Sequence, residues 1–167
     1  GDLALNSDSQ NYASIIIGGS STGNITYYRY VNSVGTSEWD LIGSPVVGES
    51  ASDIIAQTAL ASNGNPEDFG IGEYDNSTGA TGTWTTFNND EATFHGTLPA
   101  GKGYQMATDG AENSEIDFSG VLNTSTVSRV ITEGDSDGDD PSVAGTRFNL
   151  FANPYTAYVS VNSLASN

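Results

Sequence analysis

The apolar and aromatic residues of this chain come in short runs, and glycine, proline, asparagine or serine residues end nearly every run. The clearest run covers residues 24–31, where one set of side chains alternates with another, Ile25, Tyr27 and Arg29 against Thr26, Tyr28 and Tyr30. A period of two places the two sets on opposite faces of a β-strand. Many short runs with turn signals between them predict an all-β fold, an antiparallel β-sandwich of jelly-roll-like form.

The same reasoning gives the other expected elements. Strands are expected at residues 38–42, 70–74, 83–87, 102–106, 116–122, 127–132, 147–151 and 157–161. One short helix is expected over residues 52–60, with Ser52 as its N-cap, because a serine hydroxyl accepts a hydrogen bond from the first helical turn. Residues 1–23 predict a β-solenoid-like lead-in or an edge hairpin, and residues 24–167 predict the β-sandwich domain.

Two segments of the chain are similar to each other. Residues 39–45 (WDLIGSP) and 148–154 (FNLFANP) share an aromatic residue, Asp or Asn, Leu, an apolar residue, a small residue, Ser or Asn, and Pro. Because proline cannot donate to a β-ladder, each segment predicts a buried strand that stops at its proline. We expect Trp39 and Phe148 to pack in the core. Trp39 and Leu41 should face inward, whereas Glu38 and Asp40 should face outward. The two similar strands could lie near each other in one sheet.

The charge balance restricts the partners. There are 21 acidic residues against 4 basic ones, a net charge of −17, and Arg29, Lys102, Arg129 and Arg147 stand singly. Nucleic acid needs clustered cations, and anionic membrane surfaces need them too, so both are disfavoured. No stretch is long and apolar enough for membrane insertion. The absence of cysteine excludes thiol catalysis, thiolate metal sites and disulfides.

The remaining composition points to a location. Ser, Thr, Asn, Gly and Tyr are abundant and Lys is scarce, which is typical of a β-rich extracellular module. The chain opens without Met, and we expect a piece of a longer secreted or cell-surface protein.

Five segments, taken in order, carry a resemblance to a known domain. They are residues 23–31 (GNITYYRYV), 39–45 (WDLIGSP), 101–104 (GKGY), 118–124 (FSGVLNT) and 148–155 (FNLFANPY). Their order resembles an extracellular β-domain of secreted and cell-surface proteins of the Bacteroidetes, especially flavobacteria, which are often type IX secretion cargo. The resemblance covers nearly the whole chain. It implies an adhesin-like or polysaccharide-processing parent protein with neighbouring domains, and no catalytic residues in this domain. Phe148 and Ala152 stand where Trp and Gly are commoner, which affects packing.

The acidic loop at residues 133–140 (EGDSDGDD) is the strongest candidate site. Its five carboxylates lie within eight residues and repel one another, so a bound cation would relieve a real cost. Acidic oxygens at alternate positions can converge on Ca²⁺, which takes roughly six to eight oxygen ligands. Asp135, Asp137 and Asp139 are therefore the predicted ligands of a structural Ca²⁺. The loop does not match an EF-hand, and the alternative is a solvated acidic turn.

Aromatic residues supply a second candidate site. The C–H faces of sugars are apolar and their hydroxyl groups need polar partners, so exposed aromatic rings beside Asn and Asp suit sugar binding. Trp84, Tyr104 and Tyr74 are the candidate ligand-binding residues. The alternative is that they belong to the core, where strand aromatics are favoured.

Two patterns could indicate catalysis, and both lack the required context. Residues 19–23 (GSSTG) match G-x-S-x-G around Ser21, but a strand follows where a nucleophile elbow needs a helix, and the only histidine is His95. Glu73 and Glu115 could form a carboxylate pair, although a chain with 21 acids always offers some pair.

We therefore expect a non-catalytic extracellular module, stabilised by Ca²⁺, that binds a glycan or cell-surface polysaccharide or serves adhesion. The alternative is a structural spacer that presents neighbouring domains or a sorting signal. A small glycoside hydrolase is the third hypothesis.

Overall fold

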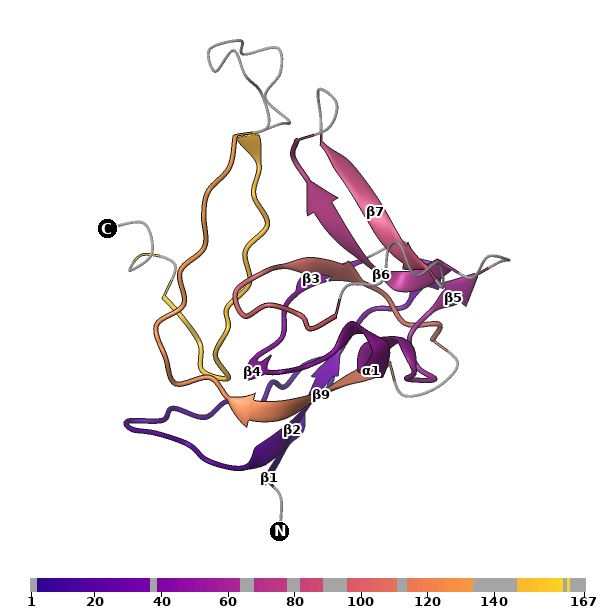
Figure 1. Cartoon of the computed structure of the whole chain (residues 1–167). Helices are drawn as coiled ribbons and strands as arrows, with labels where there is room; N and C mark the ends of the chain where they lie inside the picture. Colours follow the sequence, from indigo (N-terminus) through magenta and orange to yellow (C-terminus); the bar gives the residue numbers. More distant parts are fainter. Residues whose placement is uncertain are drawn as a thin grey trace.

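The computed structural model describes residues 3–36, 39–63, 68–77, 82–88, 96–110, 114–133, 147–160 and 162. Two β-sheets pack on each other and one short α-helix accompanies them (Figure 1), which confirms the predicted all-β sandwich. Among the described elements there is no solenoid coil at the N-terminus.

The first sheet is built around a long antiparallel pair. Strand β2 (Asn24–Tyr30) pairs with β9 (Glu115–Leu122) along its whole length, so that Tyr27 lies opposite Phe118. Strand β1 (Leu3–Leu5) lies parallel to β2 on its other side, and β4 (Val46–Val47) pairs with the end of β9. The strand order is β1-β2-β9-β4.

The hairpin expected in residues 1–23 does not form. Leu3 pairs with Ile25 of β2 in parallel, and parallel strands cannot be joined by a tight turn. Residues 14–17, expected as the second strand of that hairpin, are not a strand, and the Ile15 N–H donates instead to the carbonyl oxygen of Thr156 (3.2 Å). The N-terminal segment is thus held partly by β2 and partly by the C-terminal segment.

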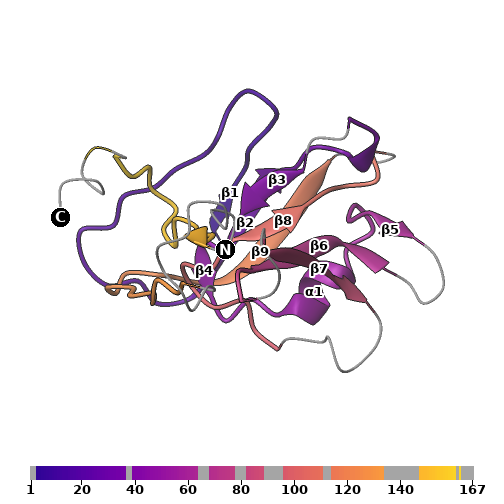
Figure 2. The ribbon, with the colours of Figure 1, turned by 90° about the horizontal axis from the view of Figure 1, so that it is seen from above.

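The second sheet has the order β3-β8-β6-β5, and β7 also pairs with β6 (Figure 2). Its strands are β3 (Asp40–Ile42), β8 (Tyr104–Met106), β6 (Asp68–Asp75), β5 (Ser62–Asn63) and β7 (Thr83–Asn88). All its pairs are antiparallel.

The core lies between the two sheets. Strand β9 alternates strictly, and its inward residues Ile116 and Phe118 are fully buried. The second sheet contributes Ile71, Phe87, Tyr104 and Met106. The rings of Phe87 and Tyr104 meet edge-on with centroids 6.0 Å apart. Because burying one such side chain stabilises by roughly 1.5–3 kcal/mol, this cluster is the main source of stability.

The helix α1 (Ala51–Ile55) is shorter than predicted, and Ser50 rather than Ser52 caps it. The Ser50 hydroxyl oxygen accepts a hydrogen bond from the Asp53 N–H (3.0 Å). The helix buries Ile54 completely. A short 3-10 helix, η1 (Val34–Thr36), precedes β3. Within the described ranges no helix combines the length and the hydropathy that crossing a bilayer requires.

The predicted facing of β3 is wrong by one residue. Ile42 points into the core, whereas Leu41 is 62% exposed. Trp39 lies just before the strand and is half-buried, and Glu38 lies outside the described residues. Asp40 holds this register, because its carboxylate accepts a hydrogen bond from the Asn32 N–H (2.7 Å). A shift of one residue along a strand reverses every face.

Residues 123–133 and 147–158 form an arm beside the two sheets (orange and yellow in Figure 1). The strands expected at 127–132, 147–151 and 157–161 do not form over the described residues. Side-chain amides link the segments instead. Asn149 accepts from the Thr132 N–H (3.0 Å) and donates to the Thr132 carbonyl (2.8 Å), and the buried Asn76 also donates to that carbonyl (2.8 Å). Phe148, predicted in the core, lies on this arm and is 65% exposed.

The two similar segments lie beside each other, as the sequence suggested. Both run along residues 101–106, since β3 pairs with β8 and Phe151 forms a bridge with Lys102. A Cβ atom on Gly43 would collide with the Cβ of Ala152, so glycine permits the close approach. Only the first segment contains a strand.

Their shared residues make the same local hydrogen bonds. Asp40 and Asn149 each accept from a backbone N–H of another segment. Before each proline, Ser44 accepts from the Val46 N–H (3.3 Å) and Asn153 from the Tyr155 N–H (3.2 Å). The repeated pattern therefore encodes a repeated turn.

Candidate functional site

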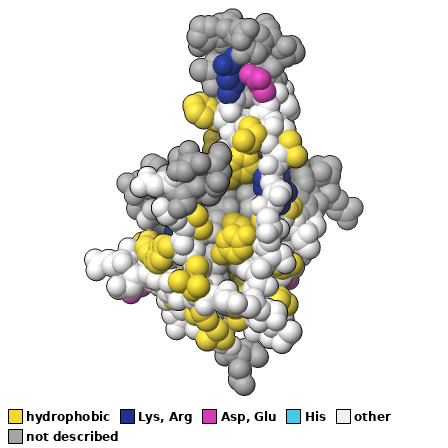
Figure 3. All heavy atoms as spheres, turned by 90° about the vertical axis from the view of Figure 1, so that its left-hand side faces the viewer, with side chains coloured by type: hydrophobic (Ala, Val, Ile, Leu, Met, Phe, Trp, Pro, Cys, Tyr) yellow, Lys and Arg dark blue, Asp and Glu magenta, His cyan; other side chains and the backbone are white. Residues whose placement is uncertain are grey.

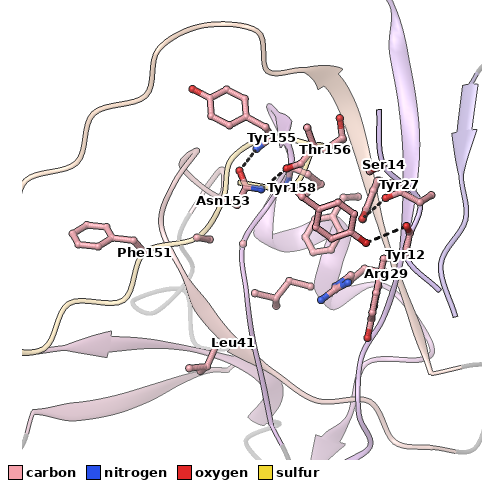
Figure 4. Close-up of a pocket in the computed structure, with 17 residues that line it drawn as sticks. Tyr12, Ser14, Tyr27, Arg29, Leu41, Phe151, Asn153, Tyr155, Thr156 and Tyr158 are labelled. Carbon is pink, nitrogen blue, oxygen red and sulfur yellow. Dashed lines mark hydrogen bonds between the residues drawn. The ribbon is translucent and has the colours of Figure 1, made fainter. Parts of the chain in front are cut away.

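A pocket of about 290 Å³ opens where residues 12–14, β2, β3 and the C-terminal segment meet (Figure 4). Its lining is rich in aromatic side chains, namely Tyr12, Tyr27, Phe118, Phe151, Tyr155 and Tyr158. Tyr158 is 73% exposed and Phe151 is 45% exposed, so apolar surface remains open to solvent at this pocket. Its volume is near the lower end of small-ligand sites, which span roughly 300–1,000 Å³.

Hydrogen bonds from β2 and from the C-terminal segment to the N-terminal segment build one wall. The Tyr27 hydroxyl donates to the Ala13 carbonyl (3.0 Å), and the Tyr158 hydroxyl donates to the Tyr12 carbonyl (3.3 Å). The Thr156 hydroxyl donates to the Ile15 carbonyl (3.3 Å). The pocket therefore exists only when the N-terminal and C-terminal segments are both in place.

The opposite wall comes from β3 and the arm. Leu41, turned outward by the register of β3, lines the pocket together with Phe151. Asn153 closes this side by donating to the Ala157 carbonyl (2.6 Å). Figure 4 shows Tyr12, Tyr27 and Arg29 on one side of the space and Phe151 on the other.

Among the described residues that line this pocket, Arg29 is the one charged side chain. It follows Ile25 and Tyr27 on the inner face of β2, at the end of the strand where the core gives way to the pocket. Its guanidinium carbon lies 4.1 Å from the centroid of the Tyr12 ring, a cation–π contact that fixes the group in place.

The molecular face that carries the C-terminal segment shows several clusters of hydrophobic side chains among polar side chains and backbone (Figure 3). Figure 3 shows hydrophobic side chains along this face, with the coloured acidic side chains at the top and at the edges. No Asp or Glu stands among the described residues that line the pocket.

The three candidate ligand-binding aromatic residues differ in burial and do not form one site. Tyr104 is 1% exposed and belongs to the core, the alternative that the sequence left open for these aromatic residues. Trp84 is 42% exposed and pairs across strands with Tyr74 of β6, with ring centroids 5.2 Å apart and ring planes at 56°. The exposed Trp84 and the half-buried Tyr74 thus form an aromatic pair separate from the pocket at Arg29.

A second hollow, of about 400 Å³, lies beside Tyr74. It is lined by polar groups, including the carboxylates of Glu73 and Asp75, together with Asn76, Thr85 and Thr132. The two hollows differ in charge, since the lining of one contains two acids and that of the other contains one arginine.

The predicted calcium ligands Asp135, Asp137 and Asp139 lie outside the described residues. Within the described part of the chain, no group of three or more His, Asp or Glu side chains is arranged to hold a metal ion. Glu133, the first residue of the acidic segment, forms an ion pair with Arg147, with 2.9 Å between Arg147 Nε and the carboxylate.

The elements proposed for catalysis are not brought together. His95 lies outside the described residues, and strand β2 directly follows the G-x-S-x-G segment. Glu73 belongs to the second sheet and accepts from the Lys102 ammonium, whereas Glu115 lies on the first sheet.

One buried carboxyl group was not predicted from the sequence. Glu49 is 2% exposed, and its carboxylate accepts from the Ser119 N–H. Gln57 likewise binds the backbone of Asp117, accepting from its N–H (2.8 Å) and donating to its carbonyl (2.7 Å). On the edge of β9 where no described strand pairs with Asp117 and Ser119, these two side chains therefore supply the hydrogen bonds to the backbone. Burial raises the pKa of Glu49 to about 7, against the opposing effect of the Ser119 hydrogen bond.

Comparison with known proteins gives no relative, since no family description, curated protein or solved structure matches this chain.

Proposed function

We propose that this chain is a non-catalytic, extracellular glycan-binding module of a larger secreted or cell-surface protein. The observation that carries the proposal is the aromatic pocket beside Arg29. Its tyrosine and phenylalanine rings offer flat apolar surface, while Ser14, Asn153 and Thr156 in the same lining bring polar groups. Sugars need this combination, because their ring C–H faces are apolar and their hydroxyl groups require hydrogen-bond partners.

The ring of Tyr158 is the sharpest point at which to test the proposal. It is the most exposed large side chain of the pocket lining, and it makes one hydrogen bond, through its hydroxyl group, to the Tyr12 carbonyl. Loss of an aromatic contact costs roughly 0.5–1.5 kcal/mol, so Tyr158→Ala should weaken glycan binding up to about tenfold.

The experiment is a glycan array followed by calorimetric titration of the best binder. Tyr158→Phe keeps the ring and removes only the hydroxyl group that donates to the Tyr12 carbonyl, so it should bind more tightly than Tyr158→Ala. Trp84→Ala is the second control, because Trp84 lies on β7, away from the pocket. Loss of binding in Trp84→Ala alone would move the site to the Trp84–Tyr74 pair. A blank array would contradict glycan binding and favour the structural spacer.

A further inference from the structure

We propose that the pocket selects acidic saccharides, with the Arg29 guanidinium binding a carboxylate or sulfate group of the sugar. This inference rests on the proposed glycan-binding function and adds the chemical class of the ligand. Arg29 differs from the other three basic residues in its partners.

Three of the four basic side chains have partners. Lys102 is paired with Glu73, and Arg147 Nε donates to Glu133 (2.9 Å). Arg129 Nε donates to the Ala100 carbonyl (2.8 Å). Within the described residues, Arg29 makes neither a hydrogen bond nor an ion pair, only its contact with the Tyr12 ring. A guanidinium group carries five N–H donors and a permanent charge, so Arg29 keeps capacity for an anion.

The pairing of β2 with β9 explains why Arg29 has no acidic partner. Arg29 lies opposite Ile116 and shares the inner face with that residue and Phe118. The acids next to Ile116 in sequence are Glu115 and Asp117, and alternation turns them to the outer face of the sheet. Arg29 is thus half-buried, and neither an ion-pair partner nor an acid in the pocket lining occurs among the described residues.

The stacking on Tyr12 adds geometric selectivity. A guanidinium that lies against an aromatic ring presents its edge, and the edge carries the parallel N–H groups that match carboxylate or sulfate oxygens. Partial burial strengthens such a contact relative to one at an open surface. The sugar ring attached to that anionic group would then reach the apolar surface of Leu41, Phe151 and Tyr158.

The second hollow supplies the internal comparison. Its lining contains Glu73 and Asp75, which would repel an acidic sugar. We therefore expect acidic ligands in the Arg29 pocket and not in the hollow that Glu73 and Asp75 line.

The test measures binding of matched acidic and neutral saccharides by calorimetric titration. The carboxylate arm uses trimers of galacturonate, glucuronate and mannuronate against their methyl esters. The sulfate arm uses sulfated galactan oligosaccharides against the desulfated ones. A background of ~0.5 M NaCl screens the repulsion from the net charge of −17. At least one acidic saccharide should bind tenfold or more tightly than its neutral counterpart. Whether that saccharide carries carboxylate or sulfate groups identifies the anionic group that Arg29 binds.

Arg29→Gln should remove this preference. Arg147→Gln is the matched control, because it changes the net charge equally and Arg147 lines neither this pocket nor the adjoining hollow that contains Lys102 and Arg129. Thermal unfolding of both variants verifies that they fold. Equal binding of acidic and neutral saccharides, or a preference that survives Arg29→Gln, would overturn the inference while leaving glycan binding intact. Absence of binding to every saccharide would instead overturn the proposed function, and this inference with it.

Discussion

The buried carboxyl group of Glu49 makes the stability of this fold depend on pH around neutrality. Glu49 is 2% exposed, and burial raises its pKa from the ordinary 4.5 to about 7. The nearby carboxylates of Asp53 and Asp117 raise it further, while the Ser119 N–H opposes the shift. The folded state therefore holds this proton more tightly than the unfolded state does.

The sign of the effect follows from linkage. Between pH 4.5 and about 7 the folded chain binds more protons at Glu49 than the unfolded chain, so the free energy of unfolding falls as the pH rises. One pKa unit corresponds to about 1.4 kcal/mol, so the contribution lost across this window is roughly 3 kcal/mol. Glu49→Gln keeps an acceptor for the Ser119 N–H and cannot ionise.

Urea denaturation measures the contribution of Glu49 ionisation to the free energy of unfolding. The unchanged chain and Glu49→Gln are compared at several pH values from about 4 to 8 in ~0.5 M NaCl. The difference in unfolding free energy, variant minus unchanged chain, should grow by roughly 3 kcal/mol over that range. Glu115→Gln removes one charge from the outer face of the same strand and serves as the control. If the difference in unfolding free energy between Glu49→Gln and the unchanged chain stays constant with pH, the pKa of Glu49 is not raised by burial.

Three further predictions concern packing and metal binding. Gln57→Ala should lower the free energy of unfolding by about 1–3 kcal/mol in urea, because it leaves a backbone N–H and a carbonyl of β9 unpaired; no change would mean that water pairs them. Phe118→Ala should cost about 3–5 kcal/mol and the exposed Phe148→Ala less than about 1, and similar losses would contradict the core assignment. Added Ca²⁺ should raise the Tm, and EDTA should reverse this, if residues 133–140 bind the ion; an unchanged Tm in both conditions contradicts the calcium prediction.

The sequence predicts the strands that are buried on one face. Strand β9 alternates apolar and polar residues over its full length, and β2 alternates likewise, so the pattern alone assigns their faces. Strand β3 has three residues, too few for a pattern to settle its register. There the hydrogen bond between Asn32 and Asp40 decides, and Leu41 turns outward into the pocket wall.

The arm shows why strand propensity alone overpredicts strands. Val130 and Ile131 are consecutive β-branched residues, yet they are 81% and 77% exposed. Their segment satisfies its backbone through side-chain amides such as that of Asn149 rather than through a ladder. Propensity measures fit to a half-buried pleated surface, and this segment has no such surface to join.

The sequence predicts only part of the candidate site. The alternation of residues 25–30 places Arg29 on the same face as Ile25 and Tyr27, and this is the signal that the sequence offers. Tyr12 and Tyr158 meet across 146 residues, and no spacing in the sequence predicts that contact. The predicted aromatics Trp84 and Tyr104 differ in burial because one lies on β7 and the other on the central strand β8.

Chemical-shift mapping by NMR, with the tightest-binding acidic saccharide, tests the site most directly. The Arg29 pocket predicts shifts at the amides of Tyr12, Arg29 and Tyr158 and at the Arg29 Nε–H, with the Trp84 indole N–H unchanged. Shifts confined to Trp84 and Tyr74, or none at saturating ligand, would contradict the assignment of the pocket as the binding site.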